Sequence, residues 1–452
     1  MTGPDSTTAA RTLIASASAA FAAFGAFWGV WGASIPRVQQ QAGITAGQLG
    51  LALLFVGVGA LPAMLLTGRA LDRWGPKVAA AAITALGAIG AGAVSAGRDL
   101  PSLCSGLGLI GAASGAADVA MNAIIGRAEN LTGRPVITRA HGVFSAAVVL
   151  SSLTTGLTSA TALPPVTPFL AVAALCLAAG LYMLRTLPST QLGDRPAPHR
   201  TAGRSPIAPL ILMGVLGALA FASENAHQSW AAVYAQDELH TSPGLAAIAP
   251  AVFAATVAIT RLSIGTLASA PARRIILAGA LADAAGAILI ATAPSLFIAA
   301  LGLVVVGAGT AVLFPTLLAV VSRHVEESHR GRATSIVTTV SYIGFLLGPV
   351  YVGQWADAAG LRAAMIAVAA LAVILFALTP ALLRRSGFGP HTQPAMRATT
   401  KTGAVSAYRR EHRNGLRASR KLSAPLEQPS EARGLRRDRL GAKDQGEGAP
   451  HD

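Results

Sequence analysis

Three carboxylic acids lie inside long apolar stretches of this chain, where an ionisable side chain is expensive, and two of them have amides close by. Asp118 is followed one helical turn later by Asn122. Glu224 is followed closely by the amides of Asn225 and Gln228. An acid buried at membrane depth marks a functional site by default, and amide side chains both donate and accept hydrogen bonds. These residues predict proton binding at the two acids, beside a binding site for a small polar solute.

Three tryptophans could complete such a site with flat apolar faces. Trp28 and Trp31 belong to the first apolar stretch, and Trp230 belongs to the seventh. We expect their rings to stack on the solute, as aromatic faces do on sugars and other hydroxylated ligands. The alternatives are packing between helices or anchoring at the membrane interface. Asp118 has an alternative too, because a buried acid can simply hold helices together.

The remaining candidates have simpler interpretations. Asp283, in the ninth stretch, is expected to be structural, with Arg261 as a partner. His141 begins the fifth stretch and is expected to be a structural hydrogen bonder. His and Cys are too sparse for a zinc site, and no phosphate-binding loop is present. We therefore expect no metal, no cofactor, no catalytic residue and no enzyme activity.

These side chains are carried by twelve apolar stretches, each long enough to cross a bilayer, which needs roughly 20 residues. Composition agrees, because 53% of the residues are hydrophobic and 12% are charged, against about 25% charged in an average soluble chain. The sequence predicts an all-α integral membrane protein. The stretches are 13–35, 48–67, 78–96, 100–124, 140–160, 166–184, 207–232, 244–267, 275–293, 295–321, 335–355 and 361–383.

The basic residues between the stretches are distributed unevenly. If the N-terminus is inside, the inner loops hold 19 Lys and Arg and the outer loops hold 3, leaving out the C-terminal tail. Basic residues that flank spans stay cytoplasmic, so both termini are expected there. The net charge of +15 then reflects topology, and no nucleic-acid partner is needed to explain it. Cys104 and Cys176 lie inside stretches, so no disulfide framework is expected.

The chain divides at two polar segments. Residues 1–12 form a short cytoplasmic N-terminus, 13–184 a six-helix half, 185–206 a cytoplasmic linker and 207–383 a second six-helix half. Residues 384–452 are expected to be a disordered basic cytoplasmic tail. The tail lacks apolar runs, and from residue 386 onward 13 Lys and Arg accompany 7 Asp and Glu. Such a segment buries too little surface to order itself.

The loop after the second stretch reads GRALDRWGPK, with Gly68, Asp72, Arg73, Gly75 and Lys77 at its key positions. This resembles the signature loop of the major facilitator superfamily, G-x-x-x-D-R-x-G-R-R. Weaker similarities recur in the second half. They are Gly265 with Arg273 and Arg274, where Ser269 replaces the acid, the run 330–333, and Gly344 with Gly348 and Pro349.

The resemblance covers roughly residues 13–385 and implies twelve transmembrane helices in two halves. In that fold spans one, four, seven and ten line a central cavity, which would include Asp118 and Glu224. Gly68 would permit a tight helix end, and Asp72, Arg73 and Lys77 would gate the cytoplasmic side. Ordinary interfacial anchoring is the alternative for these loop residues.

Two further segments, 118–122 and 141–145, resemble a bacterial branch near the fucose permease, which runs sugar with protons. This chain departs from that pattern, because no acid occurs between Thr12 and Gln39. It also lacks features of multidrug/proton antiporters. No Arg occurs between Asp99 and Ile125, and no Pro occurs from 142 to 156.

The sequence therefore predicts a proton-coupled secondary transporter, with symport expected, in a bacterial inner (plasma) membrane. It would move a small polar solute, sugar-like or another metabolite, by alternating access. We expect a monomer whose partners are the solute, the proton and membrane lipid. The alternatives are a drug/proton antiporter and, from another class, a non-transporting membrane sensor or scaffold.

Overall fold

A computed structural model of the chain describes residues 4–161, 163–188, 207–263, 271–326 and 329–388. Within these ranges the regular structure is helical, and no strand occurs. The predicted linker and the predicted tail lie almost entirely outside the described residues. The same is true of Gly265 and Ser269, the positions where the second half resembles the signature loop.

Helices α1–α7 cover the predicted first seven spans. Part of the described chain is a π-helical turn, η1 (Tyr234–Glu238), which follows α7. The helices are α1 (Pro4–Ala42), α2 (Ala46–Trp74), α3 (Lys77–Ala96), α4 (Leu100–Thr132), α5 (Val136–Ser159), α6 (Thr167–Thr186), α7 (Ile207–Val233), α8 (Pro243–Ala246), α9 (Ile248–Ser263), α10 (Ala272–Ala291), α11 (Leu296–His324) and α12 (Arg330–Arg385).

Helix α12 accounts for the last two spans. In the described part of the chain, 11 helical segments are long and apolar enough to cross a membrane. The last has 56 residues and breaks at Gly360, where φ is 86° and ψ is 167°. A straight helix of that length would extend about 84 Å, far more than the roughly 30 Å of hydrocarbon. The break therefore divides α12 into spans eleven and twelve, and the predicted all-α, twelve-span fold is confirmed.

The helix ends follow from local sequence. Thr45 caps α2 by accepting a hydrogen bond from the backbone N–H of Gln48, whose side chain accepts one from the backbone N–H of Thr45. Asp99 caps α4 in the same way with Ser102, at 2.9 Å from the Ser102 N–H. These hydrogen bonds lower the pKa of the Asp99 carboxyl. Such caps satisfy the N–H groups that a helix start leaves unpaired.

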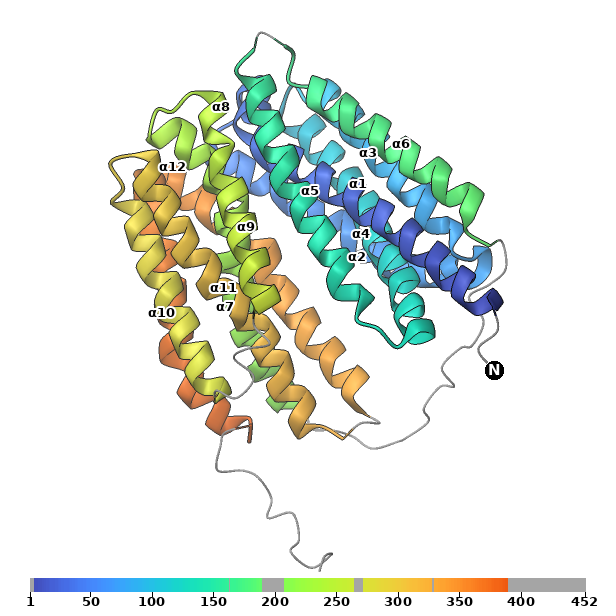
Figure 1. The fold of residues 1–452 in the computed structure, drawn as a ribbon. Coiled ribbons are helices and arrows are strands. Elements are labelled where there is room, and N and C mark those ends of the chain that lie inside the picture. Colours follow the sequence, from blue (N-terminus) through green and yellow to red (C-terminus); the bar gives the residue numbers. More distant parts are fainter. Residues whose placement is uncertain (1–3, 162, 189–206, 264–270, 327–328, 389–452) are drawn as a thin grey trace, which may run out of the picture. The chain divides into compact units, whose positions relative to one another are not determined.

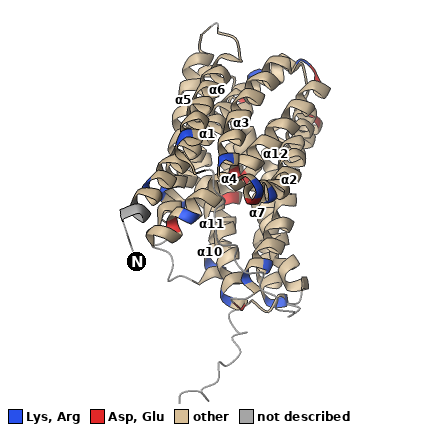
Figure 2. Ribbon diagram, turned by 90° about the vertical axis from the view of Figure 1, so that its right-hand side faces the viewer, with Lys and Arg blue, Asp and Glu red and all other residues tan. Residues whose placement is uncertain are grey.

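Glycines let neighbouring helices approach closely. A Cβ on Gly111 would collide with the carbonyl oxygen of Val56 on α2, and one on Gly115 would lie 2.8 Å from the oxygen of Ala60. These two glycines of the fourth span therefore allow α4 to pack closely on α2. The lateral surface is apolar, with Leu65, Leu157 and Phe297 each at least 70% exposed. Figure 2 shows few charged residues over most of this surface, as a lipid-facing surface requires.

The helices form two groups, α1–α6 and α7–α12 (Figure 1). Within the first group α2 packs on α4, α1 on α5, and α3 on α4 and α6. Within the second, α7 packs on α12, and α10 on α11 and α12. Two main helix pairs join the groups: α2 with α12 and α5 with α9. These four helices therefore hold the two groups together.

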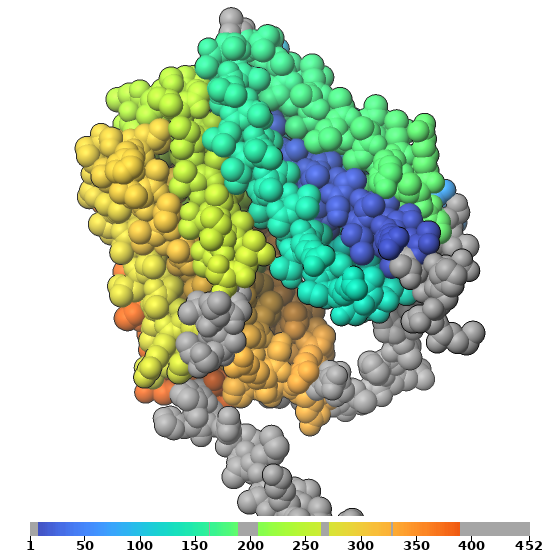
Figure 3. Space-filling model, viewed as in Figure 1, coloured from blue at the N-terminus to red at the C-terminus, as the bar shows by residue number. Residues whose placement is uncertain are grey.

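The groups touch at one end of the bundle and separate toward the other. At the closed end a Cβ on Gly50 would lie 2.7 Å from the oxygen of Pro349, and one on Gly156 2.6 Å from the oxygen of Gly244. At the open end, which carries the α2–α3 turn, the glycines have no such neighbours. A Cβ would meet nothing within 4 Å at Gly68, Gly126, Gly142 or Gly331. In Figure 3 the surface is notched there, between α5 and the start of α12.

Candidate functional site

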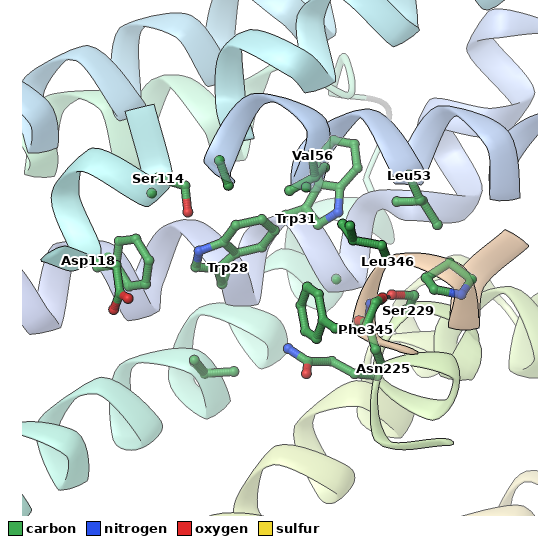
Figure 4. Close-up of a pocket in the computed structure, with 18 of the residues that line it drawn as sticks. Trp28, Trp31, Leu53, Val56, Ser114, Asp118, Asn225, Ser229, Phe345 and Leu346 are labelled. Atoms are coloured by element: carbon green, nitrogen blue, oxygen red, sulfur yellow. Dashed lines mark hydrogen bonds between the residues drawn. The ribbon is translucent and has the colours of Figure 1, made fainter. Parts of the chain in front are cut away.

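A cavity of about 280 Å³ lies between the two groups of helices. Its wall comes from α1, α2, α4 and α5 on one side and from α7, α9 and α12 on the other. Most of the wall is apolar, with a few polar side chains that converge on the space (Figure 4). A largely apolar cavity with a few converging polar groups is the usual form of a small-molecule site.

Helix α1 supplies an aromatic face to this cavity. Phe24, Trp28, Trp31 and Ile35 all line it. Their spacing of three and four residues places them on one side of a helix. The rings of Phe24 and Trp28 meet edge to face, with centroids 6.3 Å apart. Two of the predicted solute-binding residues, Trp28 and Trp31, are thus in the cavity wall.

Asp118 lines the cavity from α4, beside Ser114 (Figure 4). One carboxylate oxygen, Oδ1, accepts a hydrogen bond of 3.0 Å from the side-chain amide of Asn122. The same amide donates to the backbone oxygen of Asp118 at 2.9 Å. Asn122 itself is not part of the wall, so its role here is to orient the acid. The second oxygen, Oδ2, has no hydrogen-bond donor among the described residues.

Helix α7 brings amides to the opposite wall, where Asn225, Gln228 and Ser229 all line the cavity. The Asn225 amide donates to the backbone oxygen of Phe345 at 2.6 Å. Its carbonyl oxygen accepts from the Ser229 hydroxyl at 3.1 Å. Gln228 is exposed and makes no hydrogen bond with the described part of the chain. Asn225 is therefore held in place, while Gln228 is available to a solute.

The wall differs from the one that the resemblance implied. Among the described residues α11, which is span ten, contributes no side chain to it. The four helices that join the groups contribute instead, including Tyr342 and Phe345 from α12 and Phe144 from α5. The expectation of spans one, four, seven and ten is corrected to this extent. The sequence signal was available, because Gly344 and Gly348 indicated a close helix approach beside these aromatic residues.

The second predicted acid, Glu224, has a partner. Its carboxylate accepts a hydrogen bond from the Arg261 guanidinium at 2.7 Å, with the two side chains 14% and 44% exposed. Glu224 is not among the residues that line the cavity.

The predicted pairing of Asp283 with Arg261 is wrong. Asp283 is fully buried on α10 and accepts a hydrogen bond of 2.8 Å from the Ser223 hydroxyl. The half-exposed Arg261 reaches the neighbouring Glu224 instead.

Trp230 does not reach the cavity. It is fully buried, and two residues along a helix from Gln228 it points to a different side. Its ring nitrogen has no hydrogen-bond acceptor within the described ranges. His141, expected to be a structural hydrogen bonder, meets the ring of Phe21 edge to face at 5.0 Å.

The predicted gating residues lie at the open end. The expected helix end at Gly68 is wrong, because α2 continues to Trp74 and Gly75 ends it with a φ of 71°. Asp72 and Arg73 are exposed, and Arg73 lies over the Trp74 ring at 5.6 Å. Lys77 begins α3. Asp72 makes no ion pair with the described residues, as expected where the two groups of helices are apart.

The chain matches the family model described as the Major Facilitator Superfamily over residues 16–271 and 213–430. It is 28% identical to an uncharacterised MFS-type transporter of Yersinia pestis, over 77% of this chain and 90% of that protein. It is 27% identical to an uncharacterised transporter of Sinorhizobium fredii, over 77% and 92%.

Solved structures of the same fold are also similar to this chain. A point mutant of the nucleoside transporter NupG aligns with a TM-score of 0.69 at 14% identity, over 82% of this chain and 99% of that one. A bacterial homologue of the human lysosomal transporter Spinster aligns with a TM-score of 0.66 at 16% identity, over 86% and 100%. At these identities the likeness concerns the fold alone.

Proposed function

Since this chain belongs to the major facilitator superfamily, we propose that it is a proton-coupled secondary transporter of a small polar solute, working by alternating access in a bacterial inner membrane. The observation that carries this proposal is the cavity between the two groups of helices. It contains an incompletely bonded carboxylate, Asp118, and it is closed at one end of the bundle only.

The size of the cavity favours a small solute over a bulky drug. Sites for drug-sized ligands usually have volumes of about 300–1,000 Å³. The cavity of about 280 Å³ lies at the lower edge of that range. Trp28, Trp31 and the Asn225 and Gln228 amides offer ring faces and hydrogen bonds together, which suits a compact molecule with polar groups.

Asp118 is the first choice for the proton. Asn122 holds one of its oxygens, and the other can take a proton from the cavity. Enclosing a charged carboxylate away from water costs several kcal/mol, so protonation would favour the state in which the cavity is sealed. A proton gradient could bias the two states in this way. Glu224 remains the second choice, because Arg261 already neutralises it.

The basic loops support one orientation in the membrane. The end that carries the α2–α3 turn also carries most of the Lys and Arg flanking the helices, and such residues stay cytoplasmic. In this arrangement both termini and the open end face the cytoplasm. The apolar lateral surface contacts lipid, and a single chain contains the whole cavity.

The test is solute-driven proton movement in proteoliposomes that contain a pH-sensitive dye. The solutes are sugars, polyols, amino acids and small amines. Asp118→Asn is expected to reduce solute-driven proton flux at least tenfold. Asp99→Asn, which removes an exposed acid but keeps a good helix cap, should leave it unchanged. Normal flux through Asp118→Asn would refute coupling at this residue.

The two alternatives give different results in the same assay. An antiporter moves protons against the direction of the solute, so the dye responds with the opposite sign. A sensor or scaffold moves no solute at all. Deleting residues 389–452 gives a second test of the sensor or scaffold alternative, because a transporter should still move its solute without the tail.

A further inference from the structure

We propose that the transported solute is a small organic cation, such as a primary or quaternary ammonium compound, and that Asp118 is its counter-ion. This inference rests on the proposed function, which supplies the transport cycle, and adds the charge of the substrate. The observation that carries it is the set of charged groups around the cavity.

The cavity wall contains one carboxylate, that of Asp118, and no Lys, Arg or His from the described residues. Two basic side chains near its ends are already bonded elsewhere. Arg261 pairs with Glu224 at 2.7 Å, and Arg37 donates to the backbone oxygen of Leu163 at 2.8 Å. A cleft lined by one sign of charge with apolar walls attracts the opposite sign. The cavity therefore favours a cation and repels an anion.

The bonding of Asp118 points in the same direction. Asn122 satisfies Oδ1, while Oδ2 receives no hydrogen bond from any described residue and belongs to a side chain that lines the cavity. A neutral solute could form hydrogen bonds with the amides on the opposite wall, but it would bring no positive charge to this oxygen. An ammonium group supplies both the charge and, when primary, three N–H donors.

Aromatic rings surround the same space. Trp28 and Phe24 lie on α1, and Phe24 meets Phe144 of α5 with centroids 5.8 Å apart. Figure 4 shows Trp28 and Asp118 directed into one space. From the other group of helices Tyr342 also lines the cavity. A carboxylate among aromatic faces is the arrangement that recognises ammonium groups through charge and cation–π attraction.

The two ends of the cavity would then bind different parts of the solute. The cationic group lies near Asp118 and Trp28, and a hydroxyl or carbonyl group lies near the free amide of Gln228. A proton and an ammonium group compete for the same carboxylate. They would therefore use Asp118 in turn, and the coupling mode becomes exchange of solute for proton in place of the symport expected from the sequence. This is the coupling of the antiporter alternative, with a small cation in place of a bulky drug.

The experiment measures thermal stabilisation of the full-length protein in detergent by matched probes that differ in charge. The first pair is choline and its neutral isostere 3,3-dimethyl-1-butanol. The second pair is cyclohexylamine and cyclohexanol, and the third set is glucosamine, glucose and glucuronate. We expect at least one ammonium member to stabilise the protein at a concentration tenfold lower than its neutral partner does, and glucuronate to have no effect.

The same probes are then measured with two variants. Asp118→Asn should abolish the preference for the ammonium member, and Asp99→Asn should retain it. Equal stabilisation by the neutral partner, stabilisation by glucuronate, or no response to any ammonium probe in the wild-type protein would overturn the inference. The wild-type comparison is decisive even if Asp118→Asn does not fold.

The result also separates the inference from the proposed function. Proton-coupled transport of a neutral sugar in proteoliposomes would refute the charge assignment and leave the transporter intact. Binding of ammonium probes without any transport would refute the transporter and leave the binding site intact.

Discussion

At the scale of single residues, the two acids Asp118 and Asp283 have opposite surroundings. Asp118 lines a cavity and keeps one oxygen without a donor. Asp283 is fully buried, and Ser223 donates to its Oδ1. Its Oδ2 has no partner among the described residues. A buried carboxylate that loses its only donor must pay the full cost of desolvation, so Ser223 is expected to matter for folding.

Ser223→Ala should lower the stability of the purified protein by about 1–3 kcal/mol, because it leaves a buried carboxylate with no hydrogen bond. Thermal unfolding in detergent measures the change. The control is Ser105→Ala on α4, where an exposed hydroxyl bonds only to the backbone oxygen of Pro101. A Ser223→Ala midpoint equal to that of the control would show that the Ser223–Asp283 bond contributes nothing.

At the scale of helices, close approach of backbones determines which side chains meet. Gly111 brings α4 against α2 at Val56, and the same helix carries Asp118 two turns further on. Gly344 and Gly348 bring α12 against α7 at Ala218 and Ala222. These contacts decide where Asp118 and Tyr342 lie in the cavity wall. The glycines therefore act on the site through helix positions and not through contact with a solute.

Gly111→Ala should destabilise the protein by roughly 1–3 kcal/mol, the usual cost of overpacking, because the new Cβ collides with the backbone oxygen of Val56. The matched control is Gly92→Ala on α3, where a Cβ meets nothing within 4 Å. That change should be neutral or stabilise by up to about 1 kcal/mol. Comparing the thermal midpoints of the two variants tests the assignment, and equal midpoints would contradict it.

At the scale of the whole molecule, the closed end is a candidate gate. Thr45 at the start of α2 donates to a carboxylate oxygen of Asp357 on α12 at 2.8 Å, and α5 meets α8 at Gly156 and Gly244. Alternating access requires these contacts to break when the open end closes. On the proposed mechanism the structure represents one of the two states between which the protein would alternate.

Crosslinking Thr45→Cys to Asp357→Cys should lock the closed end and reduce transport at least tenfold, with recovery after reduction. The native Cys104 and Cys176 are buried and free, so they give little background and can be replaced by Ala. Full transport by the crosslinked protein would show that this end does not need to open.

The single variants supply the control. Thr45→Cys without its partner should remain active under oxidising conditions. In intact cells a membrane-impermeant thiol reagent should label Thr45→Cys more readily than Arg73→Cys, because the proposed orientation places Arg73 in the cytoplasm. The reverse labelling would invert the orientation.

The sequence by itself determined the class of the protein. Twelve apolar stretches and the loop at Asp72 and Arg73 were sufficient. Hydrocarbon admits only structures that satisfy their own backbone hydrogen bonds, and an apolar stretch of about 20 residues does so as a helix. It also identified Asp118, Trp28, Trp31, Asn225 and Gln228, which the structure brings to one cavity. The sequence shows which polar and aromatic residues lie within a span, whatever position that helix takes in the bundle.

Only the tertiary structure decided which partners these residues have. Sequence position could not show that Arg261 meets Glu224 and not Asp283, or that Trp230 is buried outside the cavity. It could not show that Tyr342 of α12 faces the same space as Asp118. These outcomes depend on the rotation of each helix about its axis and on how closely its neighbours approach, and both are set by packing between residues far apart in the chain.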